Sequence, residues 1–135
     1  MIGLGLEVVV EAGAGLLSRI PDADYEKAGA KIGKATDAKT ADVILKVRRP
    51  VDKEIKSIKQ GAIVIAIMDP YGNEEALAAL AKAGATTFAM ELMPRITRAQ
   101  SMDVLSSQAN LAGYQAVIDA AGEYDRAMPM MMTAA

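Results

Sequence analysis

The sequence predicts an α/β domain in which a parallel β-sheet lies between two layers of helices, a three-layer arrangement. Three observations support this prediction. Apolar runs of strand length recur along the chain, helix-compatible sequence separates each run from the next, and the connections are only a few residues long. Strands that alternate with helices in this way are typical of parallel sheets joined by right-handed crossovers.

Four apolar runs are expected to be parallel strands of a single sheet. The segment Ala62–Met68 is the clearest of them, because nearly every residue in it is apolar, as in a strand that is covered on both faces. A dense turn signal, Asp69–Asn73, follows it directly. The four expected strands are Leu6–Val10, Ile44–Val47, Ile63–Met68 and Thr86–Met90.

Four segments are expected to be helices because of their apolar spacing and their end signals. The third begins with Asn73 as a cap, carries acidic residues in its first turn and ends at Gly84. The last is long, and its apolar residues recur at three- and four-residue spacing. The expected helices are Pro21–Ala28, Val51–Ile58, the segment between Asn73 and Gly84, and Ser101–Tyr124.

The composition is that of one globular domain, and it excludes several classes of protein. The chain has 135 residues, of which 52% are hydrophobic and 24% are charged. A net charge of −2, from 15 basic and 17 acidic residues, gives no reason to expect a nucleic-acid partner. Cysteine and histidine are both absent, so no metal site and no histidine general base are expected. No apolar run approaches the roughly 20 residues of a membrane span, so direct membrane insertion is not expected.

Three motifs invite a functional interpretation but favour a structural one. Gly13–Gly15 follows the first expected strand, where dinucleotide-binding folds place glycines, but Ser18 stands where the third glycine would fall, so a plain turn is favoured. Lys46–Pro50 follows the second expected strand and is either an anion site or a solvated sheet edge, of which the edge is favoured. Met128–Met132 is expected to pack between helix and strand rather than to bind a metal.

The segment Glu91–Gln108 carries the most informative group of polar side chains. It follows the fourth expected strand, and ligands of parallel α/β sheets bind at the carboxyl ends of the strands. Gln100, Asp103 and Ser106 recur at every third residue, which on a helix would place them along one polar edge. Together with Arg95 they are suited to hydrogen-bonding a carboxamide or a ribose rather than to breaking bonds.

Composition alone favours a simpler interpretation of this segment. In that interpretation Ser101 is a helix cap, Asp103 lies in the first turn, where the helix dipole favours it, and Arg95 is a solvated loop residue. Nothing in the spacing of these residues decides between the two interpretations.

Longer motifs favour the functional interpretation. Met90–Arg95, together with Arg98–Asp103 and Leu105–Gln108, closely resembles the NAD(H)-binding component of proton-translocating NAD(P)⁺ transhydrogenase, in the alanine dehydrogenase/transhydrogenase superfamily. The similarity covers the whole chain. Further segments that resemble this family, in its order, are Val9–Gly15, Leu45–Val47, Leu111–Tyr114 and Met130–Ala135.

The resemblance implies a Rossmann/flavodoxin-like N-terminal domain and a role for individual residues. Arg95 and Asp103 would orient the nicotinamide of NAD(H) and its carboxamide. Ser106 would add a hydrogen bond, and Gln100 would help to align the NADP(H) held by a partner component. Hydride passes directly between the two nicotinamide rings, so no catalytic acid or base is expected. The residues expected to bind the cofactor are Arg95, Thr97, Arg98, Gln100, Asp103 and Ser106.

The resemblance also implies an assembly, with two alternatives left open. The component would be a cytoplasmic homodimer, peripheral to the inner (plasma) membrane, with NADP(H)-binding and membrane components as partners. Residues 1–135 are expected to be a single truncated domain that lacks the NAD-binding Rossmann domain expected after residue 135, so the isolated chain is expected to be inactive. The alternatives are a catalytically inactive, self-associating α/β remnant and an alanine dehydrogenase-like fragment. The latter shares a lysine resembling Lys46 but requires a histidine that this sequence lacks.

Overall fold

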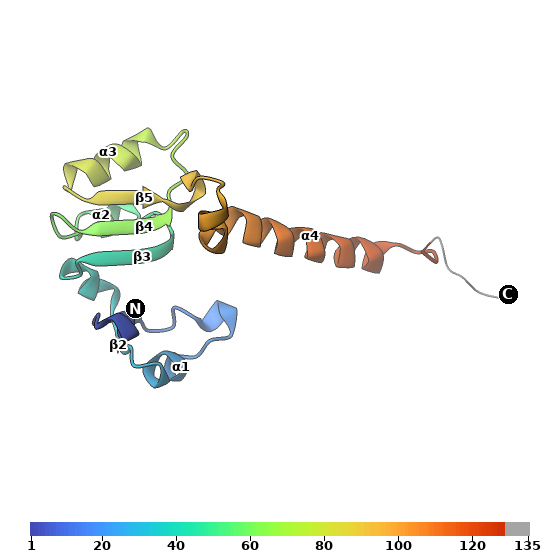
Figure 1. The fold of residues 1–135 in the computed structure, drawn as a ribbon, viewed down its shortest axis with the longest axis horizontal. Helices are drawn as coiled ribbons and strands as arrows, with labels where there is room; N and C mark the ends of the chain where they lie inside the picture. Colours follow the sequence, from blue (N-terminus) through green and yellow to red (C-terminus); the bar gives the residue numbers. More distant parts are fainter. Residues whose placement is uncertain (129–135) are drawn as a thin grey trace. The chain divides into compact units, whose positions relative to one another are not determined.

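The computed structural model describes residues 1–128, which fall into two compact units (Figure 1). The first unit is Met1–Ala89, and the second begins at Met90. No helix among residues 1–128 is both long enough and apolar enough to span a membrane. The Met-rich segment Met128–Met132, expected to pack between helix and strand, lies almost entirely outside the described residues.

The main sheet of the first unit consists of three parallel strands in the order β3-β4-β5. They are β3 (Val43–Arg48), β4 (Ile63–Ile67) and β5 (Thr86–Ala89). Their β-branched residues fit the pleated surface of a sheet, and the registers are continuous except for an irregularity near the end of β3. The predicted parallel arrangement of these three runs is confirmed, as is the α/β class.

Two helices and one face of this sheet form the hydrophobic core. The helices are α2 (Asp52–Ile55) and α3 (Glu74–Lys82). Alternate residues along and directly after β4, Val64, Ala66 and Met68, are at most 1% exposed and pack in one cluster with Ile55 and Leu80. Because side chains alternate between the faces of a strand, this cluster places α2 and α3 over the same face of the sheet.

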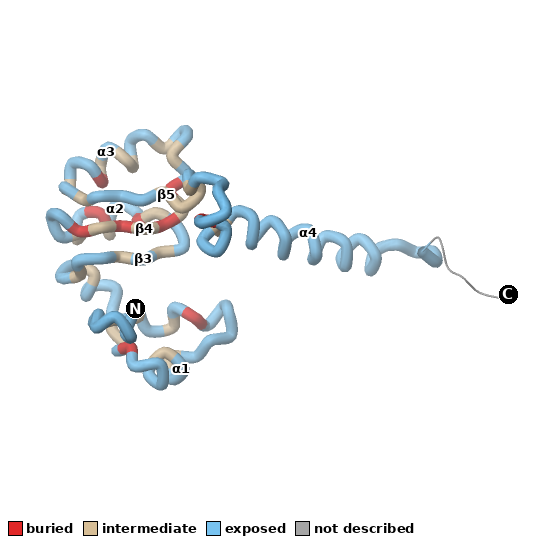
Figure 2. The backbone as a smooth tube through the Cα atoms, viewed as in Figure 1, coloured by how far each residue is buried: buried red, intermediate tan, exposed pale blue. Residues whose placement is uncertain are grey.

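Side chains on the opposite face of the sheet are largely exposed in the described part of the chain, and Figure 2 marks most of β3 and β5 as exposed. Val43, Leu45 and Phe88 point to this face and are 42%, 53% and 55% exposed. At the main sheet, residues 1–89 therefore contain two of the three predicted layers: the sheet itself and a layer of helices on one of its faces.

A second, two-stranded parallel sheet precedes the main one. It pairs β1 (Val9–Glu11) with β2 (Lys31–Gly33), and α1 (Asp22–Lys27) forms the crossover between them. The prediction that Leu6–Val10 lies in the same sheet as the other three strands was wrong. In the structure β1 pairs with β2 and not with a strand of the main sheet. The pairing with β2 closes a shorter loop than a pairing of β1 with β3 would, because β2 lies closer to β1 along the chain.

Several predicted boundaries also differ from the structure. The strand expected to reach Met90 ends at Ala89, where a 3₁₀-helix, Met90–Leu92, begins. Asn73 does precede α3, as predicted, but its side chain makes no cap hydrogen bond and is bonded instead to Arg49 and Asp69. Gly84 ends the helix as expected, with a φ of +75° that glycine adopts without strain.

The second unit consists of short 3₁₀-helices and one long α-helix. They are η4 (Met90–Leu92), η5 (Thr97–Met102) and α4 (Val104–Glu123). The helix predicted from Ser101 begins at Val104, because the first turn is taken by η5 and Asp103, rather than Ser101, is the cap. Every residue of α4 after Val104 is exposed, including Leu111 and Tyr114.

Candidate functional site

The glycine turn after β1 is closed by the chain itself. The backbone N–H of Gly13 donates to the carboxylate of Asp22, 2.9 Å from Oδ1 and 3.2 Å from Oδ2. At Gly15 a side chain would have no room, because an added Cβ would lie 2.5 Å from the carbonyl oxygen of Ile20 and 2.7 Å from the hydroxyl of Tyr25. The amide that a pyrophosphate would need is thus already bonded to an internal carboxylate, which supports the interpretation as a plain turn.

Two basic residues in β3 and directly after it, Lys46 and Arg49, are also bonded within the first unit. Lys46 forms an ion pair with Glu54 of α2. The Arg49 guanidinium donates to the carbonyl oxygen of Met68 at 3.1 Å and to Oδ1 of Asn73 at 2.5 Å. These contacts join β3 to α2 and to the turn after β4. Lys46 and Arg49 therefore connect elements within the first unit. This structural role differs from both predicted alternatives, the anion site and the solvated sheet edge.

The electrostatics of Glu54 fit this structural role. Partial burial opposes its ionisation, but the hydrogen bonds from Lys46 and from the backbone N–H of Val51 outweigh burial, and the pKa of the carboxyl is lowered. The Val51 bond is 2.7 Å long and satisfies a backbone group at the start of α2.

In the second unit, Asp103 begins α4 through two hydrogen bonds to one residue. The backbone N–H of Ser106 donates to Oδ1 at 3.0 Å, and the Ser106 hydroxyl donates to Oδ2 at 2.6 Å. These two bonds lower the pKa of Asp103, and the bond from the hydroxyl has a larger effect than the bond from the backbone N–H. The charge of Arg95 lowers the pKa further by a smaller amount. An aspartate in this position satisfies an N–H group that the first turn of a helix leaves unpaired.

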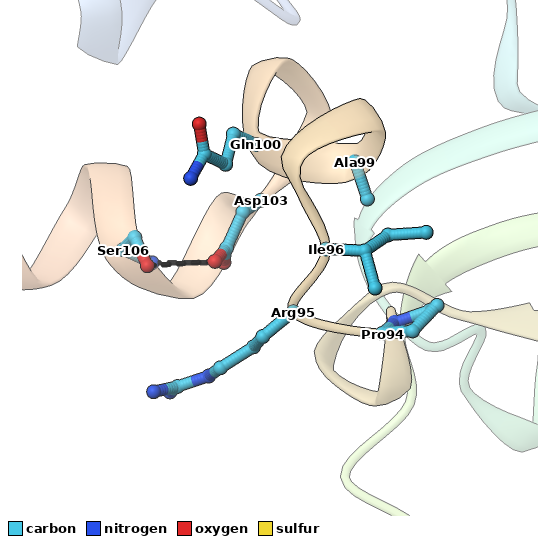
Figure 3. A pocket seen from close by; sticks show the side chains of 7 residues that line it. All are labelled: Pro94, Arg95, Ile96, Ala99, Gln100, Asp103 and Ser106. Atoms are coloured by element: carbon cyan, nitrogen blue, oxygen red, sulfur yellow. Dashed lines mark hydrogen bonds between the residues drawn. The ribbon is translucent and has the colours of Figure 1, made fainter.

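A cavity of about 180 Å³ opens beside this cap. Figure 3 shows the polar ends of four lining residues on one side of the loop and three apolar residues on the other. The volume is below the range of roughly 300–1,000 Å³ typical of complete small-molecule sites, so it suits one end of a ligand. The lining residues are Pro94, Arg95, Ile96, Ala99, Gln100, Asp103 and Ser106.

Four of the six predicted cofactor-binding residues line this cavity. They are Arg95, Gln100, Asp103 and Ser106, which come from the loop, from η5, from the cap and from the first turn of α4. The other two, Thr97 and Arg98, lie exposed on η5 and are not among the lining residues.

The prediction did not include the apolar side of the cavity. Pro94, Ile96 and Ala99 line it, and Ala99 is only 6% exposed. Ile96 directly precedes η5, and Ala99 lies on η5 three residues later in the sequence. A search for apolar residues at a period of three beside the polar ones would have identified this pair.

The groups at the cavity can hold a ligand but are poorly suited to acid-base chemistry. The lowered pKa of Asp103 makes its carboxylate a weak base toward the Ser106 hydroxyl, although the two are hydrogen-bonded. Among the described residues no group of three or more acidic side chains could hold a metal ion. What remains is a set of hydrogen-bond donors and acceptors: a guanidinium, an amide, a carboxylate and a hydroxyl.

Comparison with known proteins gives consistent matches along the chain. A family model described as "Alanine dehydrogenase/PNT, N-terminal domain" matches residues 1–112. A Rhodospirillum rubrum protein, named as the first section of the NAD(P) transhydrogenase alpha subunit, is 51% identical over 142 residues, which cover 100% of this chain and 37% of that protein. The alanine dehydrogenase of Mycobacterium tuberculosis is 32% identical over 111 residues, covering 81% of this chain and 29% of that protein.

A solved structure shares both fold and sequence with the chain. The crystal structure of transhydrogenase from Sinorhizobium meliloti superposes with a TM-score of 0.91 at 80% identity and covers 98% of this chain. The match covers 40% of the Sinorhizobium meliloti chain, so the present chain spans well under half the length of these relatives.

Proposed function

Because this chain belongs to the alanine dehydrogenase/PNT family, we propose that it is part of the NAD(H)-binding component of a proton-translocating NAD(P)⁺ transhydrogenase. In this function the chain helps to position the nicotinamide ring of NAD(H) for hydride transfer to NADP⁺. The observation that carries the proposal is the convergence of Arg95, Gln100, Asp103 and Ser106 on one cavity.

The residues of the cavity fit a carboxamide-bearing ring. The guanidinium of Arg95 can donate to the carboxamide oxygen, while Asp103 and Ser106 can accept from its amide group. The apolar residues Ile96 and Ala99 offer a surface for the ring itself. When bound, NADH supplies the hydride and NADP⁺ accepts it, so the contribution of this chain is distance and orientation.

The remaining elements of the proposal concern partners and place. Gln100, exposed at the cavity, is proposed to help align the NADP(H) carried by a partner component. Support comes from relatives that are named as subunits, which implies further components. A homodimeric, cytoplasmic assembly, peripheral to the inner (plasma) membrane and coupled to proton translocation through its membrane component, completes the proposal. Thr97 and Arg98 are proposed to contribute to cofactor binding from η5, outside the cavity.

The isolated chain is proposed to bind NADH weakly. A cavity of about 180 Å³ can hold only a small portion of a dinucleotide, and its polar side chains are exposed to competing water. Titration calorimetry with NADH is expected to show binding at least about a hundredfold weaker than that of the complete component, which corresponds to roughly 2.7 kcal/mol.

The test is hydride transfer in a chimera in which this chain replaces the matching region of the Sinorhizobium meliloti transhydrogenase, to which it is 80% identical. Arg95→Ala and Asp103→Ala are expected to slow single-turnover transfer from NADH to NADP⁺ by about a hundredfold, because a ring misplaced by about 1 Å costs on that order in rate. Affinity for NADH should fall much less, since these residues contact only one end of it.

A matched control is Ser107→Ala. The Ser107 hydroxyl donates to the carbonyl oxygen of Val104 at 3.2 Å and does not line the cavity, so this variant should transfer hydride at the parental rate. Parental rates in the Arg95 and Asp103 variants as well would reduce both residues to ordinary loop and cap positions and overturn the proposal.

A further inference from the structure

A groove of about 1070 Å³ runs between α2 and α3 in the first unit. Its apolar lining includes Ile55 and Ile58 on the side of α2, and Ala76 and Ala79 on the side of α3. Ile55 is buried, whereas the other three side chains are only partly buried. The groove therefore keeps apolar surface that a partner could cover.

The two ends of this groove carry opposite charges. The strands β3, β4 and β5 are parallel, so the crossover helices that join them both run opposite to the strands and begin at the same end of the groove. Asp52 and Glu75 lie in the first turns of α2 and α3, whereas Lys56 directly follows α2 and Lys82 is the last residue of α3. All four are exposed, and none of them forms an ion pair within residues 1–128. The groove thus has an acidic end and a basic end.

This charge pattern fits an elongated partner better than a small molecule. Glu75 and Lys82 are separated by two turns of α3, which is roughly 10.5 Å along a helix axis. The charged residues at both ends are exposed, so a small molecule would keep much of its surface in water, whereas small-molecule sites enclose most of theirs. The fitting partner is a helix with a basic group at one end and an acidic group about two turns away.

The helix α3 of a second copy has this pattern. When two copies of α3 lie antiparallel, Lys82 comes opposite the partner's Glu75, and Glu75 comes opposite the partner's Lys82. Contacts that are exchanged in this way define a two-fold, isologous interface. We propose that the groove between α2 and α3 is the surface through which two copies of this chain associate, with their α3 helices antiparallel and Glu75 paired with the partner's Lys82.

The residue between the two charges suits close packing of the helices. Ala79 is four positions after Glu75 and three before Lys82, so the three residues share one side of α3, and all three line the groove. A methyl side chain at this point lets two helix axes approach to the short end of the usual range of about 8–10 Å. The inference rests on the homodimer of the proposed function and names a surface for it. The cofactor cavity, in the second unit, is not involved.

Sedimentation equilibrium of the 135-residue chain at several concentrations tests this interface. The parental chain is expected to show a reversible equilibrium between monomer and dimer. Lys82→Glu and Glu75→Lys should each raise the dissociation constant by at least about tenfold, because the two-fold axis makes each substitution turn two attractive pairs into two repulsive ones. The effect should shrink at high salt concentration, which screens exposed charges.

A mixture of the two variants gives the sharpest result. In a dimer of one Lys82→Glu chain and one Glu75→Lys chain, both pairs again join opposite charges. The equimolar mixture should therefore associate with about the parental affinity, although neither variant does so alone. Lys53→Glu is the matched control, because it makes the same change of charge at an exposed residue of α2 outside the groove, and it should leave the dissociation constant within about threefold of the parental value.

The outcomes separate this inference from the proposed function. Single variants that dimerise as well as the parent would overturn the proposed surface, while the homodimer would stand with its interface elsewhere. A mixture that fails to associate would overturn the pairing of Glu75 with the partner's Lys82. A parental chain that stays monomeric would also overturn the surface, and the same measurement on the chimera then decides whether the homodimer stands. Hydride transfer in the chimera is measured separately, and its failure would overturn the cofactor site without affecting this interface.

Discussion

In the first unit, the polar groups that resemble anion sites already have internal partners: the N–H of Gly13 is bonded to Asp22, and Arg49 is bonded to Asn73. In the second unit, the side chains of Arg95 and Gln100 line a cavity and make no hydrogen bonds to any described residue. Each region has an arginine after a strand of the main sheet, Arg49 after β3 and Arg95 beyond β5. Their difference shows that a functional interpretation depends on whether a polar group is already bonded within the fold.

Burial separates the two regions in the same way. Val64 and Leu80 of the first unit are 0% and 1% exposed, whereas Leu111 and Val117 of α4 are 58% and 67% exposed. Packing therefore stabilises the first unit, while α4 begins through its cap at Asp103 and has no core of its own in the described residues.

The largest expected effect tests this contrast in burial. Leu80→Ala should destabilise the first unit by about 2–5 kcal/mol, because it opens a cavity in a packed core. Leu111→Ala on α4 should change stability by less than about 0.5 kcal/mol, since its side chain is mostly in water. Urea unfolding monitored by amide hydrogen exchange measures both effects, at the β4 amides for Leu80→Ala and at the α4 amides for Leu111→Ala. A loss of more than about 1 kcal/mol for Leu111→Ala would show that α4 is covered by a partner.

The sequence predicts those strands that a local run of apolar residues encodes. The strands β3, β4 and β5 are apolar runs of adequate length, and they were predicted. In contrast, Lys31–Gly33 has a single large apolar side chain, and it is a strand only because it pairs with β1. That pairing is non-local and leaves no periodic signal in the segment itself.

The cavity shows the same limit at the level of single residues. The spacing of Gln100, Asp103 and Ser106 predicted one polar edge, and these residues do line one cavity. The simpler interpretation assigns the cap to Ser101, whereas the structure has Asp103 as the cap; serine and aspartate are both good caps and stand two residues apart. The choice between them depends on the length of η5, which the sequence pattern did not reveal.

A smaller effect tests the contrast between bonded and unbonded polar groups. Asp22→Ala should destabilise the first unit by about 1 kcal/mol, because it leaves the N–H of Gly13 without its acceptor. Gln100→Ala, which removes an amide with no partner among residues 1–128, should change stability by less than about 0.5 kcal/mol. Thermal unfolding of the two variants gives the comparison, and equal losses would contradict the distinction between the two regions.

The smallest effect concerns pH and the Lys46–Glu54 ion pair. The pKa of Glu54 is lowered in the folded chain from its ordinary value of 4.5, so its bonded form contributes stability above about pH 4.5. This contribution should disappear as the pH falls through the folded pKa, where Glu54 takes up a proton.

In Glu54→Gln the side chain can still accept from the N–H of Val51 but cannot titrate. The stability difference between parent and variant should therefore be largest above pH 4.5 and shrink in more acidic solution. Urea midpoints measured across this range decide the matter, and a difference between parent and Glu54→Gln that stays constant with pH would mean that the ion pair adds nothing to the stability of the first unit.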